Sequence, residues 1–205
     1  SLGCLIIGFS GGEVFLRKDF FEIAEYAKVK GFGIGVFTNG ATISDNNILR
    51  IKSLNLLKLQ IGFYGASNTT YTKVTRNPEA RPKVMRALKL LNKHDVPFLL
   101  GGLVSKDNYW EFQEMIDIGK RLCNGQGRLK FGTSMIPRFN GDIEPLSYEI
   151  SAEQKEYLHQ SQLRRYVTTK PSRDVFCEAG ISTVTIGPYG GIYPCTSLGI
   201  SGGNI

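Results

Sequence analysis

The stretch Leu5-Ile6-Ile7-Gly8-Phe9-Ser10-Gly11-Gly12-Glu13 decides the fold. Its apolar first half predicts a buried strand, which ends in two glycines and a carboxylate. Glycines at the C-terminal end of a strand let a ligand approach the backbone, because no Cβ atom stands in the way. A carboxylate there could accept hydrogen bonds from a ligand's ammonium group. The stretch also fits an ordinary strand-to-helix turn, so the rest of the chain must decide between the two interpretations.

Strand and helix patterns alternate after this stretch. Strands are expected at residues 33–37, 56–63, 97–104 and 128–136, and helices at 19–30, 44–54, from Pro82 onward, 109–122 and 151–166. Ser44 is expected to cap the second helix, and Ser151 with Gln154 forms a capping box. Five strands alternating with helices predict a parallel sheet, open or closed, whose ligands gather at the C-terminal ends of the strands. Three small or polar stretches fall at those ends, namely Gly11-Gly12-Glu13, Thr38-Asn39-Gly40 and Tyr64-Gly65.

The pattern changes from about Val175, where alternating residues and a glycine-rich turn predict a β-hairpin. Cys177 and Cys195 stand at the two bases of this hairpin, so their sulfur atoms could face one ligand. Cys4, on the first strand, and Cys123, at a helix end, are expected to be buried thiols. Four scattered cysteines are too few for a disulfide scaffold, which favours a reducing, cytoplasmic compartment.

The composition limits the classes of function. The chain has 205 residues, of which 41% are hydrophobic and 21% charged, as in a globular protein. No signal peptide and no apolar run long enough to cross a bilayer is visible, so no membrane partner is expected. The net charge of +7 is densest at residues 76–93. That run is typical of the solvated face of a helix, and without an aromatic-rich binding motif nucleic acid is an unlikely partner.

Four motifs occur in an order that resembles radical S-adenosylmethionine enzymes. They are Phe9-Ser-Gly-Gly-Glu13, Phe37-Thr-Asn-Gly40, Gly62-Phe-Tyr-Gly-Ala66 and the hairpin with Cys177 and Cys195. The chain is most similar to the peptide- and protein-modifying branch that carries a cysteine-rich SPASM extension. This resemblance implies an α/β fold, a partial (β/α)6 TIM-like barrel lacking its first β/α unit, at residues 1–170. The start of a SPASM-like domain would follow at residues 171–205.

The resemblance also implies the chemistry. A [4Fe-4S] cluster would cleave S-adenosylmethionine to a 5′-deoxyadenosyl radical, which abstracts a hydrogen atom from a peptide or protein substrate. An electron donor such as flavodoxin or ferredoxin would reduce the cluster. The implied cofactor contacts are Gly11, Gly12, Glu13, Thr38, Asn39, Gln60, Gly62 and Ser105. Cys177 and Cys195 would be thiolate ligands of an auxiliary iron–sulfur cluster.

The chain departs from the family pattern at several positions. The CxxxCxxC motif that holds the radical cluster is absent, so its ligands are expected upstream and these 205 residues alone are expected to be inactive. Val14 replaces a common proline, and Gly62 stands where serine is common, which removes one expected hydrogen bond to the cofactor. An internal fragment of a longer enzyme and a non-catalytic barrel that lost the motif both fit these departures. A zinc or disulfide hairpin on an unrelated barrel is a third interpretation.

Overall fold

The computed structural model describes residues 3–123, 128–168 and 179–205. The strands are β1 (Ile6–Phe9), β2 (Gly33–Thr38), β3 (Lys58–Gly62), β4 (Leu99–Leu103), β5 (Arg128–Gly132), β6 (Thr185–Ile186), β7 (Gly191–Tyr193) and β8 (Gly203–Asn204). The α-helices are α1 (Phe20–Val29), α2 (Ile48–Ser53), α3 (Asn68–Thr75), α4 (Ala80–Lys93), α5 (Phe112–Leu122) and α6 (Ala152–Gln160). Short 3-10 helices lie at Val14–Leu16, Tyr109–Glu111, Glu144–Tyr148 and Gln162–Tyr166.

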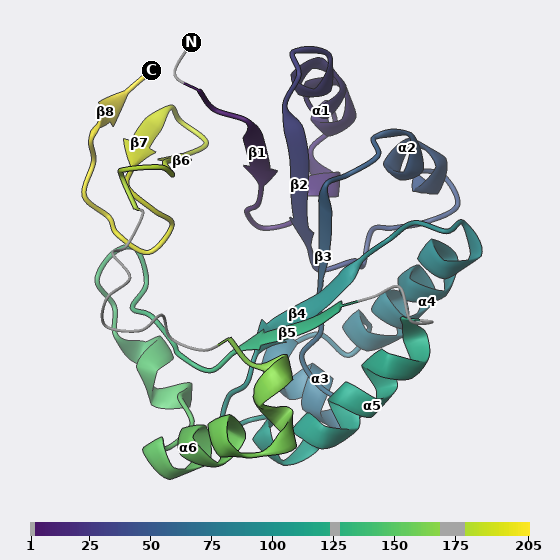
Figure 1. Ribbon diagram of the computed structural model, residues 1–205, viewed down its shortest axis with the longest axis vertical. Helices are drawn as coiled ribbons and strands as arrows, with labels where there is room; N and C mark the ends of the chain where they lie inside the picture. Colours follow the sequence, from purple (N-terminus) through teal and green to yellow (C-terminus); the bar gives the residue numbers. More distant parts are fainter. Residues whose placement is uncertain (1–2, 124–127, 169–178) are drawn as a thin grey trace.

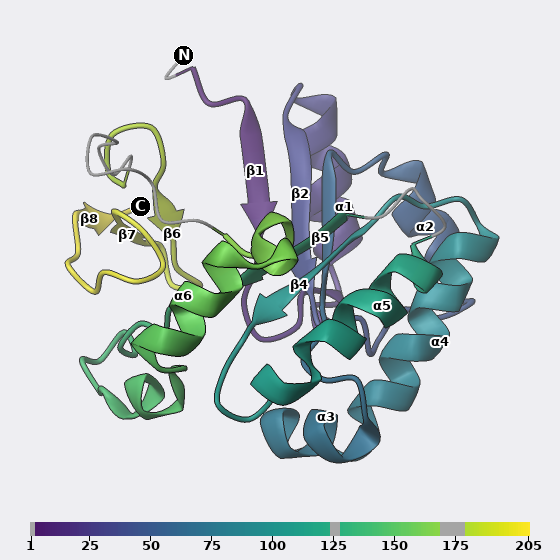
Figure 2. The ribbon, with the colours of Figure 1, turned by 60° about the horizontal axis from the view of Figure 1, so that its bottom comes forward.

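The main sheet is parallel, with its strands in the order β1-β2-β3-β4-β5. Right-handed crossovers in sequential order place every connecting helix on the same face, so the opposite face becomes the inside of a barrel. Figures 1 and 2 show the sheet curving with α1, α2, α4 and α5 along its outer side. Val167 continues the series, because it forms a parallel bridge with Phe131 of β5. The predicted partial barrel is therefore confirmed.

The hydrophobic core lies between the sheet and the outer helices. Side chains alternate between the two faces of a strand, so every second residue of β2 to β5 points into this core. Val36, Ile61, Leu100 and Phe131 are completely buried there. On the inner face Phe37 keeps 37% of its surface exposed, because that face lines the open interior of the partial barrel. The polar strand ends are thus supported by a rigid, buried layer.

Strand β1 differs from its prediction as a buried strand. Leu5, just before the strand, is 76% exposed and Ile6 is 57% exposed, whereas Ile7 and Phe9 are half-buried. The cause is position, since β1 is the edge of the sheet and pairs with β2 alone in the part of the chain described. Its outer side still packs, with the rings of Phe9 and Phe20 meeting edge to face at 5.4 Å.

Several helix boundaries differ from those expected. Ser44 does not cap α2, because the helix begins only at Ile48, four residues later. Asn47 precedes the helix, and its side chain accepts a hydrogen bond from the Ser44 amide (2.9 Å). The capping box of Ser151 and Gln154 is confirmed. The helix expected to reach residue 166 ends at Gln160, and a 3-10 turn follows it.

Helix α3 was not expected. Ser67 caps it by accepting a hydrogen bond from the Thr70 amide at 3.1 Å.

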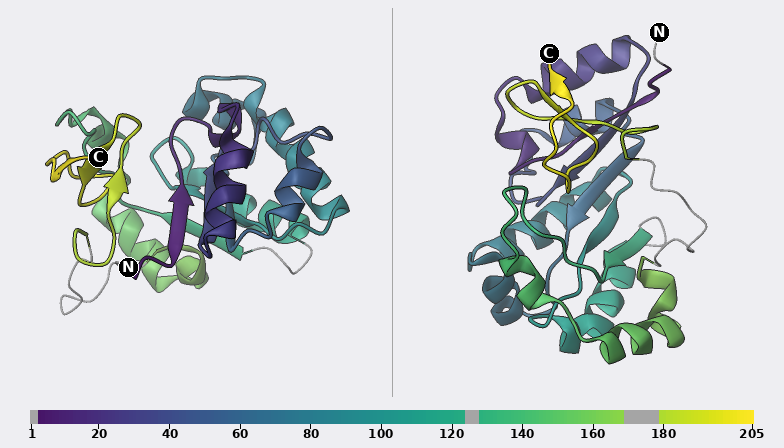
Figure 3. Two further views of the ribbon diagram at one scale, coloured as in Figure 1. Left: turned by 90° about the horizontal axis from the view of Figure 1, so that it is seen from above. Right: turned by 90° about the vertical axis from the view of Figure 1, so that its left-hand side faces the viewer.

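The predicted hairpin is present as β6 and β7, joined by a turn in which the Gly187 amide donates to the Gly191 carbonyl at 2.8 Å. A third strand, β8, pairs with β7 and completes a small antiparallel sheet. Figures 1 and 3 show this sheet on the side where the edge strand β1 lies, away from α4 and α5. It packs on the segment after β5 through Phe139 and Tyr193, whose rings are 4.7 Å apart. The domain boundary predicted at residues 170/171 lies outside the described residues.

None of the helices described is both long and apolar enough to cross a membrane.

Candidate functional site

A cavity of about 250 Å³ lies where β1, β2, β3 and β4 end. It is lined by Ser10, Gly11, Gly12, Phe37, Thr38, Asn39, Gln60, Gly62, Tyr64, Gly101 and Gly102. Six of the eight residues expected to contact a cofactor belong to this set, and Glu13 and Ser105 lie outside it. The sheet therefore brings the six together at the edge where parallel barrels bind ligands. Their contact with a cofactor stays a prediction.

The glycines after β1 leave the cavity wall open. A Cβ atom added at Gly11 or Gly12 would meet no atom within 4 Å. Gly11 has a φ of +144°, a conformation that residues with side chains rarely adopt, whereas Gly12 carries no such restriction. A side chain at Gly12 would extend into open space without disturbing the backbone.

The Glu13 carboxylate is held by the chain itself. Its Oε1 accepts hydrogen bonds from Thr38 Oγ1 (2.6 Å), Thr42 Oγ1 (3.3 Å) and the Phe15 amide (3.3 Å), and its Oε2 accepts one from the Asn39 amide (2.9 Å). These bonds tie the end of β1 to the turn after β2. Only Oε2 keeps room for a donor from a ligand. The geometry thus gives Glu13 a positioning role, and the expected bond to a ligand ammonium group stays a prediction.

The turn after β2 presents polar atoms to the cavity. Thr38 Oγ1 accepts a bond from the Gly40 amide (3.0 Å), and Asn39 Oδ1 accepts one from the Ala41 amide (2.8 Å). These bonds fix the turn, which Gly40 closes with a φ of +74°. The side-chain nitrogens of Asn39 and Gln60 make no hydrogen bond to any group that the structure describes. Both are donors available to a ligand.

A second cavity of about 320 Å³ lies beside the first, at the ends of β3, β4 and β5. It is lined by Tyr64, Lys73, Val74, Arg76, Leu103, Ser105, Asp107, Met135, Arg138, Glu144, Pro145 and Tyr148. The predicted cofactor residue Ser105 is therefore separated from the other six. Lys73 pairs with Asp107 (2.8 Å), and Arg138 pairs with Asp142 and Glu144. A cavity that has both apolar and charged walls is typical of a ligand-binding site, so this one could hold a substrate.

Two polar side chains outside the predicted set hold the loops around these cavities. Glu111 accepts hydrogen bonds from the amides of Ala66 and Ser67 and from the hydroxyls of Ser67 and Thr70, at 2.5–3.1 Å. Burial alone would raise the pKa of Glu111, but these hydrogen bonds outweigh it and lower the pKa below its usual value. Glu111 thereby fixes the loop between β3 and α3.

Asn108 is completely buried and joins the ends of β3 and β4. Its side-chain nitrogen donates to the carbonyls of Tyr64 and Leu103 at 3.0 Å each, and its oxygen accepts from the Ser105 amide at 2.8 Å. The sequence shows both Asn108 and Glu111 as ordinary polar residues near a helix start. The partners of Glu111 lie 41–45 residues away, and Tyr64 lies 44 residues from Asn108, so no local pattern could have identified these long-range bonds.

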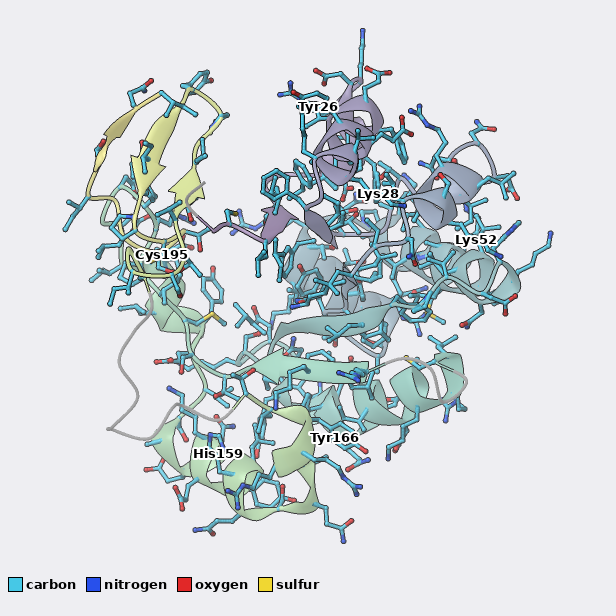
Figure 4. All side chains as sticks on the ribbon, turned by 45° about the horizontal axis from the view of Figure 1, so that its top comes forward. Tyr26, Lys28, Lys52, His159, Tyr166 and Cys195 are labelled. Atoms are coloured by element: carbon cyan, nitrogen blue, oxygen red, sulfur yellow. The ribbon has the colours of Figure 1, made fainter. Side chains whose placement is uncertain are left out.

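The cysteines fall into different environments. Cys4 is exposed and precedes β1, so the expectation of a buried thiol on a strand was wrong. Cys123 is buried as expected, and burial raises the pKa of its thiol to about 11. Cys195 is a half-buried free thiol in the turn that follows β7, and Figure 4 shows it at the base of the small sheet, while His159 lies on α6. Cys177 lies outside the described residues, so the binding of one auxiliary cluster by Cys177 and Cys195 stays a prediction.

No group of three or more His, Cys, Asp or Glu residues suited to a metal occurs in the described ranges.

The fold and the site define a partial parallel α/β barrel with a glycine-rich cavity at the C-terminal ends of its strands. The sequence model of the Radical SAM superfamily matches residues 1–118, which is more than half of the chain. The chain therefore belongs to the radical SAM superfamily.

One relative in sequence and two solved structures are similar to this chain. An AdoMet-dependent heme synthase from Methanosarcina barkeri is 26% identical over 100% of this chain and 66% of its own length. Streptococcus suis SuiB bound to precursor peptide SuiA has a similar fold, with a TM-score of 0.70, 13% identity, and coverage of 93% of this chain and 48% of SuiB. Native anSMEcpe with bound AdoMet and the Kp18Cys peptide has a TM-score of 0.57 at 18% identity, with coverage of 74% and 43%. The chain thus spans just under two thirds of the Methanosarcina relative.

Proposed function

We propose that the 250 Å³ cavity binds S-adenosylmethionine and that the chain is the barrel core of a radical enzyme. The observation that supports this proposal is the set of residues that line the cavity at the ends of β1, β2, β3 and β4. Gly11 and Gly12 leave space beside the backbone, while the side-chain nitrogens of Asn39 and Gln60 make no hydrogen bond within the described residues and can donate to a ligand. Such a surface fits a ligand that combines flat apolar parts with carboxylate and hydroxyl groups. Glu13 holds the turn that presents Asn39.

The cofactor, bound with a reduced [4Fe-4S] cluster, supplies the radical that removes a hydrogen atom from the substrate. The four cysteines of this chain do not form the CxxxCxxC motif, so no residue here is assigned to that cluster. Cys177 and Cys195 remain the proposed ligands of an auxiliary cluster in a SPASM-like segment from residue 171. Flavodoxin or ferredoxin is the proposed electron donor.

The substrate is proposed to occupy the 320 Å³ cavity, which shares Tyr64 with the cofactor cavity. A peptide or protein substrate is supported by two similar folds, SuiB with its precursor peptide and anSMEcpe with a peptide. A tetrapyrrole is the second candidate, because the relative aligned over the whole chain is named a heme synthase. Leu103 and Met135 give this cavity apolar walls that either substrate could use.

The radical reaction is tested by extending the chain upstream of Ser1, reconstituting it with iron and sulfide, and adding S-adenosylmethionine and dithionite. Formation of 5′-deoxyadenosine is the expected result. A protein that binds S-adenosylmethionine but forms no 5′-deoxyadenosine would instead be the non-catalytic barrel.

The second candidate is tested by titrating the protein with hemin and following its visible absorption. A saturable one-to-one spectral shift that Leu103→Glu removes would favour the tetrapyrrole. The absence of such a shift would favour the peptide.

A further inference from the structure

Tyr64 occupies a central place among the cavities. It is the second residue after β3, and it lines the 250 Å³ cavity, the 320 Å³ cavity and a third one of about 200 Å³. Its backbone carbonyl is fixed by Asn108, and its ring meets the ring of Tyr71 edge to face at 5.9 Å. The side chain is therefore held in one place between the cofactor cavity and its neighbours.

The ring of Tyr64 lies on two glycines of the sheet. A Cβ atom added at Gly62 would stand 2.7 Å from the Tyr64 hydroxyl oxygen and 2.9 Å from two ring atoms. A Cβ atom at Gly102 would stand 3.3 Å from the same ring. The hydroxyl thus takes the position into which a side chain at residue 62 would extend. A side chain at residue 62 would therefore require the Tyr64 side chain to shift.

The hydroxyl of Tyr64 is available to a ligand. It makes no hydrogen bond to any group in the described part of the chain. It also remains accessible to solvent, so a ligand in the cavity can reach it. Burial raises the pKa of Tyr64, and the negative charge of Glu13 raises it further. The hydroxyl therefore stays protonated at neutral pH and acts as a hydrogen-bond donor.

We propose that the Tyr64 hydroxyl donates a hydrogen bond to S-adenosylmethionine bound in the 250 Å³ cavity. Gly62, directly below the ring, has no side chain that could make this bond. This inference rests on the proposed function, because it assumes the same ligand in the same cavity.

The first test is equilibrium dialysis of radiolabelled S-adenosylmethionine against the wild-type chain and Tyr64→Phe, which keeps the ring over Gly62. Losing one hydrogen bond to a ligand should weaken binding about 5- to 20-fold. Tyr157→Phe removes a hydroxyl from an exposed residue of α6 and should bind like the wild type. Tyr64→Phe binding within twofold of the wild type would overturn the inference but leave the proposed function standing. A wild-type chain that does not bind would overturn both.

A second test moves the hydroxyl group from residue 64 to residue 62. Tyr64→Ala removes the ring and hydroxyl, and should weaken binding at least as much as Tyr64→Phe. Adding Gly62→Ser to Tyr64→Ala returns a hydroxyl to the vacated space, and binding should recover by several fold. Gly62→Ser alone should fail to improve binding, because its Cβ would stand 2.9 Å from the Tyr64 ring. A double variant that binds no better than Tyr64→Ala would contradict the inference that a hydroxyl group in this space donates a hydrogen bond to the ligand.

Discussion

Removing the Glu13 carboxylate should destabilise the end of the barrel that forms the cofactor cavity. In Glu13→Ala, the Thr38 hydroxyl and the Asn39 amide lose an acceptor at 2.6 and 2.9 Å, and two longer bonds at 3.3 Å disappear as well. Hydrogen bonds to a charged group contribute about 1.5–3 kcal/mol each. Because Glu13 is half-buried and water can replace part of the loss, we expect the free energy of unfolding to fall by about 2–4 kcal/mol.

The assay is urea unfolding followed by circular dichroism, with Glu25→Ala as the matched control. Glu25 pairs with Arg50 at 3.3 Å, and both side chains are nearly half exposed, so its removal should cost about 0–1 kcal/mol. Glu13→Ala should also weaken S-adenosylmethionine binding, because the turn that presents Asn39 loses its anchor. If the free energy of unfolding falls by the same amount in Glu13→Ala and Glu25→Ala, to within about 0.5 kcal/mol, the positioning role of Glu13 is refuted.

Two further predictions concern titrating groups. The folded-state pKa of Glu111 is lowered, so its stabilising effect is present above the unfolded pKa near 4.5 and is lost as the pH falls through the folded value. In urea unfolding, the stability gap between the wild type and Glu111→Gln should therefore narrow from pH 6 to pH 3, and a constant gap would contradict this. With its pKa near 11, Cys123 carries about 100-fold less thiolate at pH 8 than a thiol of pKa 9.0. Mass spectrometry after brief iodoacetamide treatment should find Cys4 alkylated before Cys123, and the reverse order would disprove the burial argument.

The sequence was informative where local chemistry and topology agree. The order of strands and helices follows from hydrophobic periodicity, and the sequential parallel sheet follows from that order. Since all strands of such a sheet end at the same edge, the stretches at Gly11, Thr38 and Gly62 had to lie close together. This is why six predicted residues line one cavity.

Features that depend on distant partners were missed. Helix α3 has the sequence NTTYTKVT, whose β-branched residues disfavour a helix, and it forms because Ser67 caps it and Glu111 holds its first turn. The Ser44 cap does not form, because the chain makes a turn over residues 44–47 in which Asn47 accepts from the Ser44 amide, and α2 starts only after Asn47. The sequence also does not reveal that Thr38 and Asn39 supply donors to Glu13 from within the chain, while its bond to a ligand stays a prediction.

The most direct test of the central claim is whether a side chain at Gly12 closes the cavity to S-adenosylmethionine. A Cβ atom at Gly12 meets nothing within 4 Å, so Gly12→Leu should fold normally while filling the open space. Gly202→Leu is the control. Gly202 directly precedes β8 of the small antiparallel sheet, and a Cβ atom added there makes an ordinary 3.7 Å contact with the Ile192 carbonyl oxygen. In equilibrium dialysis, we expect the wild type and Gly202→Leu to bind S-adenosylmethionine and Gly12→Leu to lose binding. Equal binding by all three proteins would contradict the assignment of this cavity to the cofactor.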